Sequence, residues 1–241
     1  MTMQSNVPEW ASVMPAGGER HLPIYLLLDT SASMNGAPIQ AVQAGLEQFQ
    51  QETASDPFAR DVVRVGVITF NSDVQMIAGG LVPISSFQPP QLVASGVTRI
   101  DLAFHRLVES MDRDVMRAVK GGQKGDWKPG VFILTDGYPT DANGHLTDRL
   151  WRPARDAVTN RPTGHIKPSS IVAVGCGPNV DDTILKAMST GMAFRMGTDQ
   201  ASFATLFQYL TQSIVSSVQS GVTIDDPFAD MQQFSNLIRI A

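Results

Sequence analysis

The sequence is poor in cysteine, and this shortage excludes several kinds of site. Cys176 is the only cysteine among 241 residues, so the chain cannot form an intramolecular disulfide or a zinc site built from several thiolates. We interpret Cys176 as a small apolar residue of a buried strand and not as a reactive thiol.

The chain also lacks long hydrophobic runs and clustered positive charge. No stretch approaches the roughly 20 apolar residues of a membrane-spanning helix, and no basic region followed by an apolar run marks a signal peptide. With 18 Lys and Arg against 23 Asp and Glu, the net charge is -5, which argues against nonspecific binding of nucleic acid. We therefore expect a cytoplasmic protein that binds neither membrane nor nucleic acid.

What the sequence does contain is typical of one globular domain. Hydrophobic residues make up 43% of the chain and charged residues 17%, a composition that favours a packed core. Residues 1–20 are rich in Pro, Gly and small residues and are predicted to form a loose arm, followed by one α/β domain over residues 21–220. Residues 221–241 form a tail that could add a strand or dock on a partner, although packing on its own domain is the interpretation we favour.

Apolar runs without polar alternation follow one another along the domain, separated by helical patterns. They predict strands at residues 23–29, 63–70, 131–136, 170–175 and 193–196, with a hairpin partner at 73–81. Apolar positions at helical spacing predict helices at residues 38–52, 100–115, 146–159, 183–189 and 203–218. This order predicts an α/β fold with a doubly wound, mostly parallel central sheet, one antiparallel edge strand and helices on both faces.

Two of the predicted strands end in aspartate, Asp29 and Asp136. In a parallel sheet both carboxylates would lie at the carboxyl edge, where a bound cation would compensate their charge. Ser31 and Ser33 alternate with Asp29 in the turn after the first strand, and Thr98 adds a hydroxyl from a third loop. Carboxylate, hydroxyl and water oxygens are hard ligands that suit Mg²⁺ or Mn²⁺.

The segments Asp29-x-Ser31-x-Ser33, Thr98 and Leu134-Thr135-Asp136-Gly137 together resemble the metal-ion-dependent adhesion site of the von Willebrand factor A family. All five ligand positions occur in the family's order. Within that family the chain is similar to the bacterial tellurite-resistance TerY-like group, through the stretches Leu22-Pro-Ile-Tyr-Leu-Leu-Leu-Asp29, Phe87-Gln-Pro-Pro90, Lys124-Gly-Asp-Trp-Lys-Pro129 and Leu134-Thr-Asp-Gly-Tyr-Pro-Thr-Asp141. Two features depart from the pattern. Ala32 replaces the usual Gly, and a single cysteine cannot supply the cysteine-rich module that some TerY-like proteins carry.

The resemblance implies a role for each of the five residues. Ser31 and Ser33 would ligate the metal directly, Thr98 directly or through water, and Asp29 and Asp136 mainly through bound waters and as charge balance. The expected cation is Mg²⁺, with Mn²⁺ or Ca²⁺ as the other ions that such a site could hold. One coordination position would stay open for an Asp or Glu carboxylate of a protein partner. The resemblance also implies a bacterial stress or tellurite-response system with a protein kinase and a PP2C-type phosphatase as companions.

Other interpretations of the same residues stay open. Helix capping is the plainest alternative, above all for Thr98, which precedes a predicted helix. A metal-assisted hydrolase is a second alternative, since a metal with an open position can activate water, although no credible general base lies near the motif. A third is a scaffold whose partner surface ignores the metal. Because neither a phosphate-binding loop nor a G-x-S-x-G elbow is present, we expect no enzyme, no catalytic residue and no bound organic cofactor.

Three further residues carry weaker expectations. We interpret Asp101 as a first-turn charge favoured by the helix dipole, and Asp141 as a solvated turn residue. Trp127, in a polar loop, could anchor a partner or pack under its own loop.

Overall fold

One mixed sheet runs through the described part of the chain. The computed structural model describes residues 20–119, 124–178, 180–220 and 237–240. The strands are β1 (Leu22–Asp29), β2 (Val63–Phe70), β3 (Val74–Met76), β4 (Val82–Pro83), β5 (Gly130–Thr135), β6 (Ser170–Cys176), β7 (Met192–Met196) and β8 (Leu237–Arg239). Their order across the sheet is β3-β2-β1-β5-β6-β7-β8, with β4 also paired to β2. The strands from β2 to β7 in this order run parallel, whereas β3, β4 and β8 are antiparallel to their neighbours.

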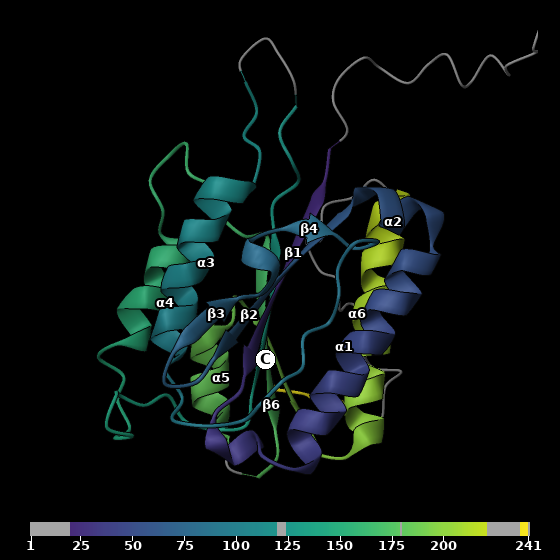
Figure 1. Cartoon of the computed structure of the whole chain (residues 1–241). Coiled ribbons are helices and arrows are strands. Elements are labelled where there is room, and N and C mark those ends of the chain that lie inside the picture. Colours follow the sequence, from purple (N-terminus) through teal and green to yellow (C-terminus); the bar gives the residue numbers. More distant parts are fainter. Residues whose placement is uncertain (1–19, 120–123, 179, 221–236, 241) are drawn as a thin grey trace, which may run out of the picture.

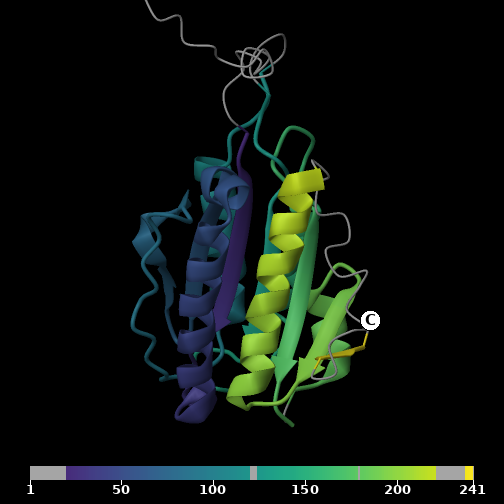
Figure 2. The same ribbon diagram turned by 90° about the vertical axis from the view of Figure 1, so that its right-hand side faces the viewer.

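Helices cover both faces of the sheet (Figure 1). They are α1 (Ala37–Ser55), α2 (Pro57–Val62), α3 (Ile100–Asp114), α4 (Trp151–Thr159), α5 (Asp182–Met188) and α6 (Gln200–Ser220). Figure 2 shows α1 and α6 side by side on one face, and α3, α4 and α5 cover the other (Figure 1). The predicted fold class, a mostly parallel doubly wound sheet between helices, is confirmed; β3 is the predicted antiparallel edge strand, and β8 adds a second one at the other edge.

The central strands are apolar throughout because both of their faces are buried. In β1, Ile24, Leu26 and Leu28 pack into the core cluster beneath α1 and α6. Tyr25 and Leu27 point the other way, into the cluster beneath α3 and α4. Two apolar layers therefore fix the position of β1, and with it the loop that follows Asp29.

The predicted helix at residues 146–159 is wrong in its first part, since α4 begins only at Trp151. Residues 140–146 form a closed turn instead, in which an isolated antiparallel bridge joins Thr140 to Leu146. Asp141 Oδ1 accepts hydrogen bonds from the backbone N–H groups two and four residues later. The apolar Leu146 gave the segment a helical pattern, but the N–H of Thr147 donates to Pro139 O at 3.1 Å and the hydroxyl of Thr147 accepts the N–H of Arg149 at 3.2 Å, so these N–H groups are bonded outside a helix. Asp141 is thus the turn residue that was expected.

Two short elements, α2 and β4, were not predicted, and β8 is the added strand that was one of the possibilities for the tail. α2 follows Asp56, whose carboxylate accepts a hydrogen bond from the N–H of Ala59 at 2.8 Å, with Pro57 in the first turn. β8 belongs to the tail and pairs with β7, while residues 1–19 of the arm and 221–236 of the tail lie outside the described residues. Among the described helices, none has both the length and the apolar character that crossing a membrane requires.

Candidate metal centre

The sheet topology brings the two strand-end aspartates to one edge. β1 and β5 are parallel neighbours with Leu28 in register with Leu134, so Asp29 at the end of β1 and Asp136 directly after β5 leave the sheet together. The carboxyl ends of the parallel strands lie at the lower end of the molecule in Figure 1. This is the edge at which doubly wound sheets bind their ligands.

Three of the five predicted ligand side chains form one hydrogen-bonded chain. The Oγ atoms of Ser31 and Ser33 lie 3.1 Å apart, and Ser33 Oγ donates to Asp136 Oδ1 at 2.7 Å. Oxygens that share one octahedral Mg²⁺ at about 2.1 Å are separated from their neighbours by about 3 Å. The spacing of these three oxygens therefore fits the ligand shell of one small cation.

The hydroxyl of Thr98 lies near Gly137, as the hydroxyl of Ser33 does. A Cβ atom added to Gly137 would lie 3.7 Å from Thr98 Oγ1 and 3.8 Å from Ser33 Oγ, so both hydroxyls border the backbone of Gly137. The backbone of Thr98 is held by Thr140, whose Oγ1 accepts the N–H of Thr98 at 3.0 Å and whose own N–H donates to Thr98 O at 2.9 Å. The third loop thus presents its hydroxyl to the site from a fixed position.

Backbone hydrogen bonds join this third loop to the first. The N–H of Ser95 donates to Thr30 O at 2.8 Å, and the N–H of Ala32 donates to Gly96 O at 3.0 Å. Ala32 replaces the usual glycine of the motif, but the bond it makes uses only its N–H, and its methyl group is exposed. The departure from the family pattern leaves the connection between the two loops in place.

Asp29 is buried, and burial makes the charged form of its carboxyl group unfavourable. Its Oδ1 accepts the N–H of Ser31 at 2.8 Å and its Oδ2 accepts the hydroxyl of Thr135 at 2.6 Å. Burial nevertheless raises the pKa of Asp29 to about 6, and the charge of Asp136 adds to this rise. Burial also raises the pKa of Asp136. A divalent cation would offset the unfavourable burial of both carboxylates. Because both oxygens of Asp29 already accept hydrogen bonds, this residue suits contact with the cation through a bound water.

Within the described residues, no group of three or more His, Cys, Asp or Glu side chains is placed to hold a metal ion. A cation at this edge would therefore depend on the hydroxyl oxygens of Ser31, Ser33 and Thr98 as well as on the two carboxylates. This is the chemistry of a hard-cation site and differs from that of a zinc site made of imidazoles and thiolates.

The capping interpretation fails for these residues. The N-cap of α1 is Gly36, and the N-cap of α3 is Arg99 without a side-chain capping bond, so Thr98 caps no helix. Ser31 precedes the short 3-10 helix Ala32–Met34, again without a side-chain capping bond. None of these hydroxyls therefore caps a helix through a side-chain hydrogen bond.

Sequence reasoning missed the residues that hold the predicted ligands in place. Thr135 orients Asp29 and lies inside the motif, so its position was a usable signal. Thr140 supports Thr98 from a loop whose conformation the sequence does not reveal. Cys176 is buried, as expected, and its thiol donates to Thr135 O at 3.4 Å.

The remaining candidates lie outside this set. Asp101, in the first turn of α3, forms a two-point ion pair with Arg99 at 2.9 and 2.8 Å. Trp127 is partly buried against the core beneath α1 and α6, with the guanidinium of Arg20 4.7 Å from its ring centroid. It packs under its own loop, the second of the two expectations.

The chain belongs to the von Willebrand factor type A domain family, whose sequence model matches residues 24–212. No curated protein matches the chain by sequence. The family's metal-ion-dependent adhesion site is the motif that the five residues resemble.

Solved structures share the fold at low sequence identity. One is a von Willebrand factor type A protein from Catenulispora acidiphila, with 15% identity and a TM-score of 0.58 over 81% of this chain and 43% of that one. A second is proximal thread matrix protein 1 of the mussel byssus with a zinc-occupied adhesion-site motif, with 17% identity and a TM-score of 0.52 over 83% and 49%. A third is the domain of the pilus tip protein Mfa5 from Porphyromonas gingivalis, with 12% identity and a TM-score of 0.55 over 87% and 100%. The chain thus spans less than half the length of the first two.

Proposed function

We propose that this chain is a metal-dependent protein-interaction module. Von Willebrand factor type A domains often mediate metal-dependent protein interactions. The observation that carries the proposal is the contiguous set of oxygens on Ser31, Ser33 and Asp136, spaced 3.1 and 2.7 Å apart at the carboxyl edge of the sheet.

In this proposal the hydroxyls of Ser31, Ser33 and Thr98 hold the cation, and Asp29 and Asp136 balance its charge. The cation is Mg²⁺, which prefers oxygen ligands and keeps part of its water shell. Once bound, it supplies a positive centre that attracts an Asp or Glu carboxylate of a partner protein. Asp29 contributes by its fixed position, since both of its oxygens are held by neighbours in the chain.

The biological setting belongs to the same proposal. The stretches shared with the TerY-like group support a bacterial cytoplasmic protein of a stress or tellurite-resistance system. A protein kinase and a PP2C-type phosphatase are the partners that this setting suggests. We propose that the chain acts by binding and not by catalysis, because the two carboxyl groups at the site serve as charge balance and offer no separate general base.

Calorimetric titration with Mg²⁺ and Mn²⁺ tests the metal site. The wild type should bind one cation, and Ser31→Ala should weaken this binding by roughly tenfold or more through loss of a ligand oxygen. Ser55→Ala is the matched control, since Ser55 is exposed at the far end of α1. Failure of the wild type to bind either cation would remove the proposal.

Co-purification of the chain with the kinase and the phosphatase tests the partner. Capture should be strong in Mg²⁺, and it should be lost in EDTA and in Ser31→Ala. Capture that survives EDTA would instead favour a scaffold whose partner surface ignores the metal.

A further inference from the structure

The third loop of the candidate metal centre, residues 95–99, is bonded to three other loops of the carboxyl edge. The loop after β1 is joined to it through Ser95 and Ala32, and the loop after β5 through Thr140. The turn after β2, residues 71–73, makes a further connection. Because β2, β1 and β5 are neighbours in the sheet, the third loop depends on contacts at the ends of three adjacent strands.

The turn after β2 holds the third loop through Asn71 and Ser72. The N–H of Val97 donates to Ser72 Oγ at 3.1 Å, and the N–H of Arg99 donates to Asn71 O at 3.1 Å. The side-chain amide of Asn71 donates to Ser95 Oγ at 3.2 Å. Ser72 lies outside the segments of the adhesion-site motif, and only the fold brings it to the third loop.

Gly96 allows Ser72 to approach the third loop closely. Its φ of 73° lies in the left-handed region that favours glycine. A Cβ atom at this position would clash with Oγ of Ser72 and press against its main-chain N. The missing side chain therefore leaves room for the hydroxyl of Ser72 beside the next N–H group, that of Val97.

Two hydroxyl groups accept two consecutive N–H groups of the third loop. Ser72 Oγ accepts the N–H of Val97, and Thr140 Oγ1 accepts the N–H of Thr98 at 3.0 Å. The two hydroxyls come from different loops, one after β2 and one after β5. Backbone N–H groups outside helices and strands need such partners. We call Ser72 and Thr140 the hydroxyl clamp.

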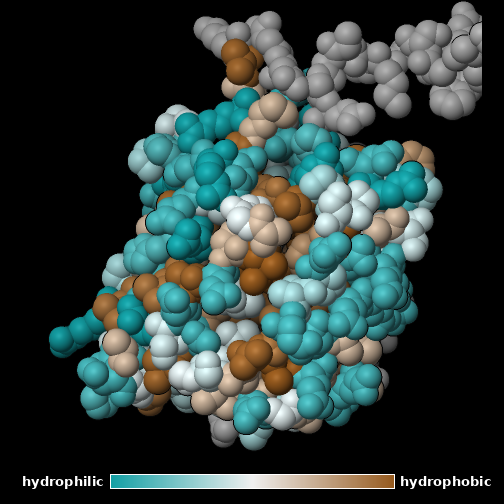
Figure 3. Space-filling view, viewed as in Figure 1, coloured by the Kyte–Doolittle hydropathy of each residue, from teal (hydrophilic) through white to brown (hydrophobic). Residues whose placement is uncertain are grey.

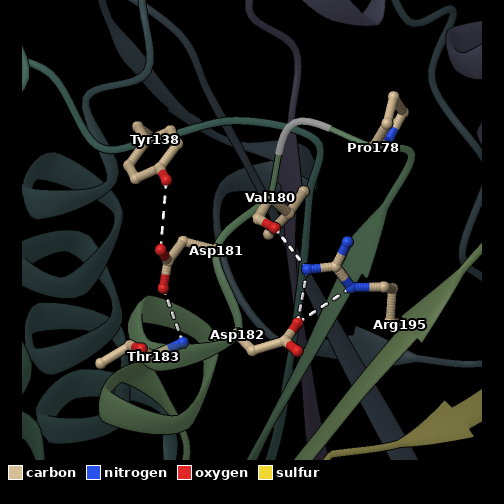
Figure 4. A pocket seen from close by; sticks show the side chains of 7 residues that line it. All are labelled: Tyr138, Pro178, Val180, Asp181, Asp182, Thr183 and Arg195. Carbon is tan, nitrogen blue, oxygen red and sulfur yellow. Dashed lines mark hydrogen bonds and ion pairs between the residues drawn. The ribbon is translucent and has the colours of Figure 1, made fainter.

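The loop that carries Thr140 is itself anchored on both sides of this residue. Tyr138 donates its hydroxyl to Asp181 at 3.2 Å, a bond that Figure 4 shows reaching across to α5. Asp181 also accepts two N–H groups in the first turn of α5. After Thr140, the carboxylate of Asp141 closes the turn. Thr140 therefore accepts its hydrogen bond from a fixed position.

Little apolar surface is available to hold these loops. Residues 71–73, 95–99 and 138–141 are mainly small or polar. Figure 3 shows polar residues mixed with apolar ones over the lower end of the molecule, the end at which the carboxyl edge lies. The position of the third loop therefore depends on hydrogen bonds more than on apolar packing.

We propose that Ser72 and Thr140 are positioning residues for the metal, and that the hydroxyl clamp favours Mg²⁺ over Ca²⁺. This inference rests on the proposed function. Mg²⁺ needs ligands at about 2.1 Å in a nearly ideal octahedron, whereas Ca²⁺ accepts distances of about 2.3 to 2.6 Å and irregular geometry. A main chain held at two consecutive N–H groups limits the movement of the Thr98 hydroxyl. Loosening the clamp therefore weakens Mg²⁺ binding more than Ca²⁺ binding.

Calorimetric titrations with Mg²⁺ and with Ca²⁺ test the clamp. Ser72→Ala and Thr140→Val each remove one hydroxyl and should lower the Mg²⁺ affinity roughly three- to tenfold. The Ca²⁺ affinity should fall less, so the ratio of the two affinities should decrease. Thr140→Ser keeps the hydroxyl and should retain the wild-type ratio. A residue that served only the stability of the fold would leave this ratio unchanged.

Ser85→Ala and Thr163→Val are the matched controls, because both residues are exposed in turns away from the third loop. Circular dichroism in EDTA checks that the variants fold, and Ser72→Ala, at an exposed position, decides the matter if Thr140→Val does not.

Wild-type Mg²⁺ affinity in the clamp variants would overturn the positioning role. Equal losses of Mg²⁺ and Ca²⁺ affinity would overturn the preference for Mg²⁺. Both results leave the proposed function intact, whereas a wild type that binds no cation would remove the clamp and the proposed function together.

Discussion

At the scale of single residues, Asp29 is the most constrained group of the candidate site. Its carboxylate is buried, faces Asp136 and is held by Ser31 and Thr135. The sequence predicts the position of Asp29, because an apolar run that ends in a carboxylate is visible without a structure. It does not predict that the hydroxyl of Thr135 donates a hydrogen bond to one of the two carboxylate oxygens, because this contact depends on the register between β1 and β5.

The raised pKa of Asp29 predicts a pH dependence for the metal-free protein. On folding the pKa rises from 3.8 to about 6, so the folded state holds this proton more tightly than the unfolded chain. The stability that Asp29 contributes is therefore complete below about pH 4 and is lost as the pH rises through 6. For a rise of the pKa from 3.8 to about 6, this loss of folding free energy is roughly 3 kcal/mol.

Urea denaturation in EDTA measures this effect. The wild type should have a lower free energy of unfolding at pH 7 than at pH 5, and Asp29→Asn should lose most of this difference. An identical pH profile for the variant would contradict the assignment of the effect to Asp29.

At the scale of elements, the central strands were predictable because burial on both faces leaves a continuous apolar pattern. The closing helix α6 was predictable from its long apolar periodicity. The six residues of α2 are too few for such a pattern, although Asp56 and Pro57 carried a capping signal. β8 contains only three residues and depends on the exposed edge of β7, a feature that exists only after the sheet has formed.

The contact between α1 and α6 predicts an unusual response to mutation at Gly45. Helix propensity alone predicts that Gly45→Ala stabilises the protein by about 1 kcal/mol. In the structure, however, the new Cβ would lie 2.2 Å from Cδ2 of Phe207, a buried ring between the two helices. Overpacking of this kind costs about 1–3 kcal/mol, so we expect a net loss of up to about 2 kcal/mol.

Chemical denaturation of Gly45→Ala checks this prediction. Gln51→Ala, at an exposed position of the same helix, is the control and should change the stability little. A stabilised Gly45→Ala variant would show that α1 and α6 pack less closely than described.

At the scale of the whole molecule, a ligand that binds only the folded chain should raise its stability. At a Mg²⁺ concentration about 100-fold above the dissociation constant, the gain is about 2.7 kcal/mol. For a domain of this size it corresponds to a rise in Tm of roughly 5–10 °C. Thermal scans should show this shift in the wild type and its absence in Ser31→Ala. A shift of equal size in the variant would place the stabilising ion elsewhere.

The two loops that meet at Ser31 and Thr98 are joined through main-chain atoms, from Ser95 to Thr30 and from Ala32 to Gly96. No side chain takes part in these two bonds. These two connections therefore do not depend on which oxygen-bearing side chains stand at positions 31 and 33. Exchanging a hydroxyl for a carboxylate or an amide at position 31 or 33 would alter the ion that the site prefers, while the two main-chain hydrogen bonds between the loops remain. The ion selectivity of this domain could thus diverge, in evolution or by design, without a change of fold.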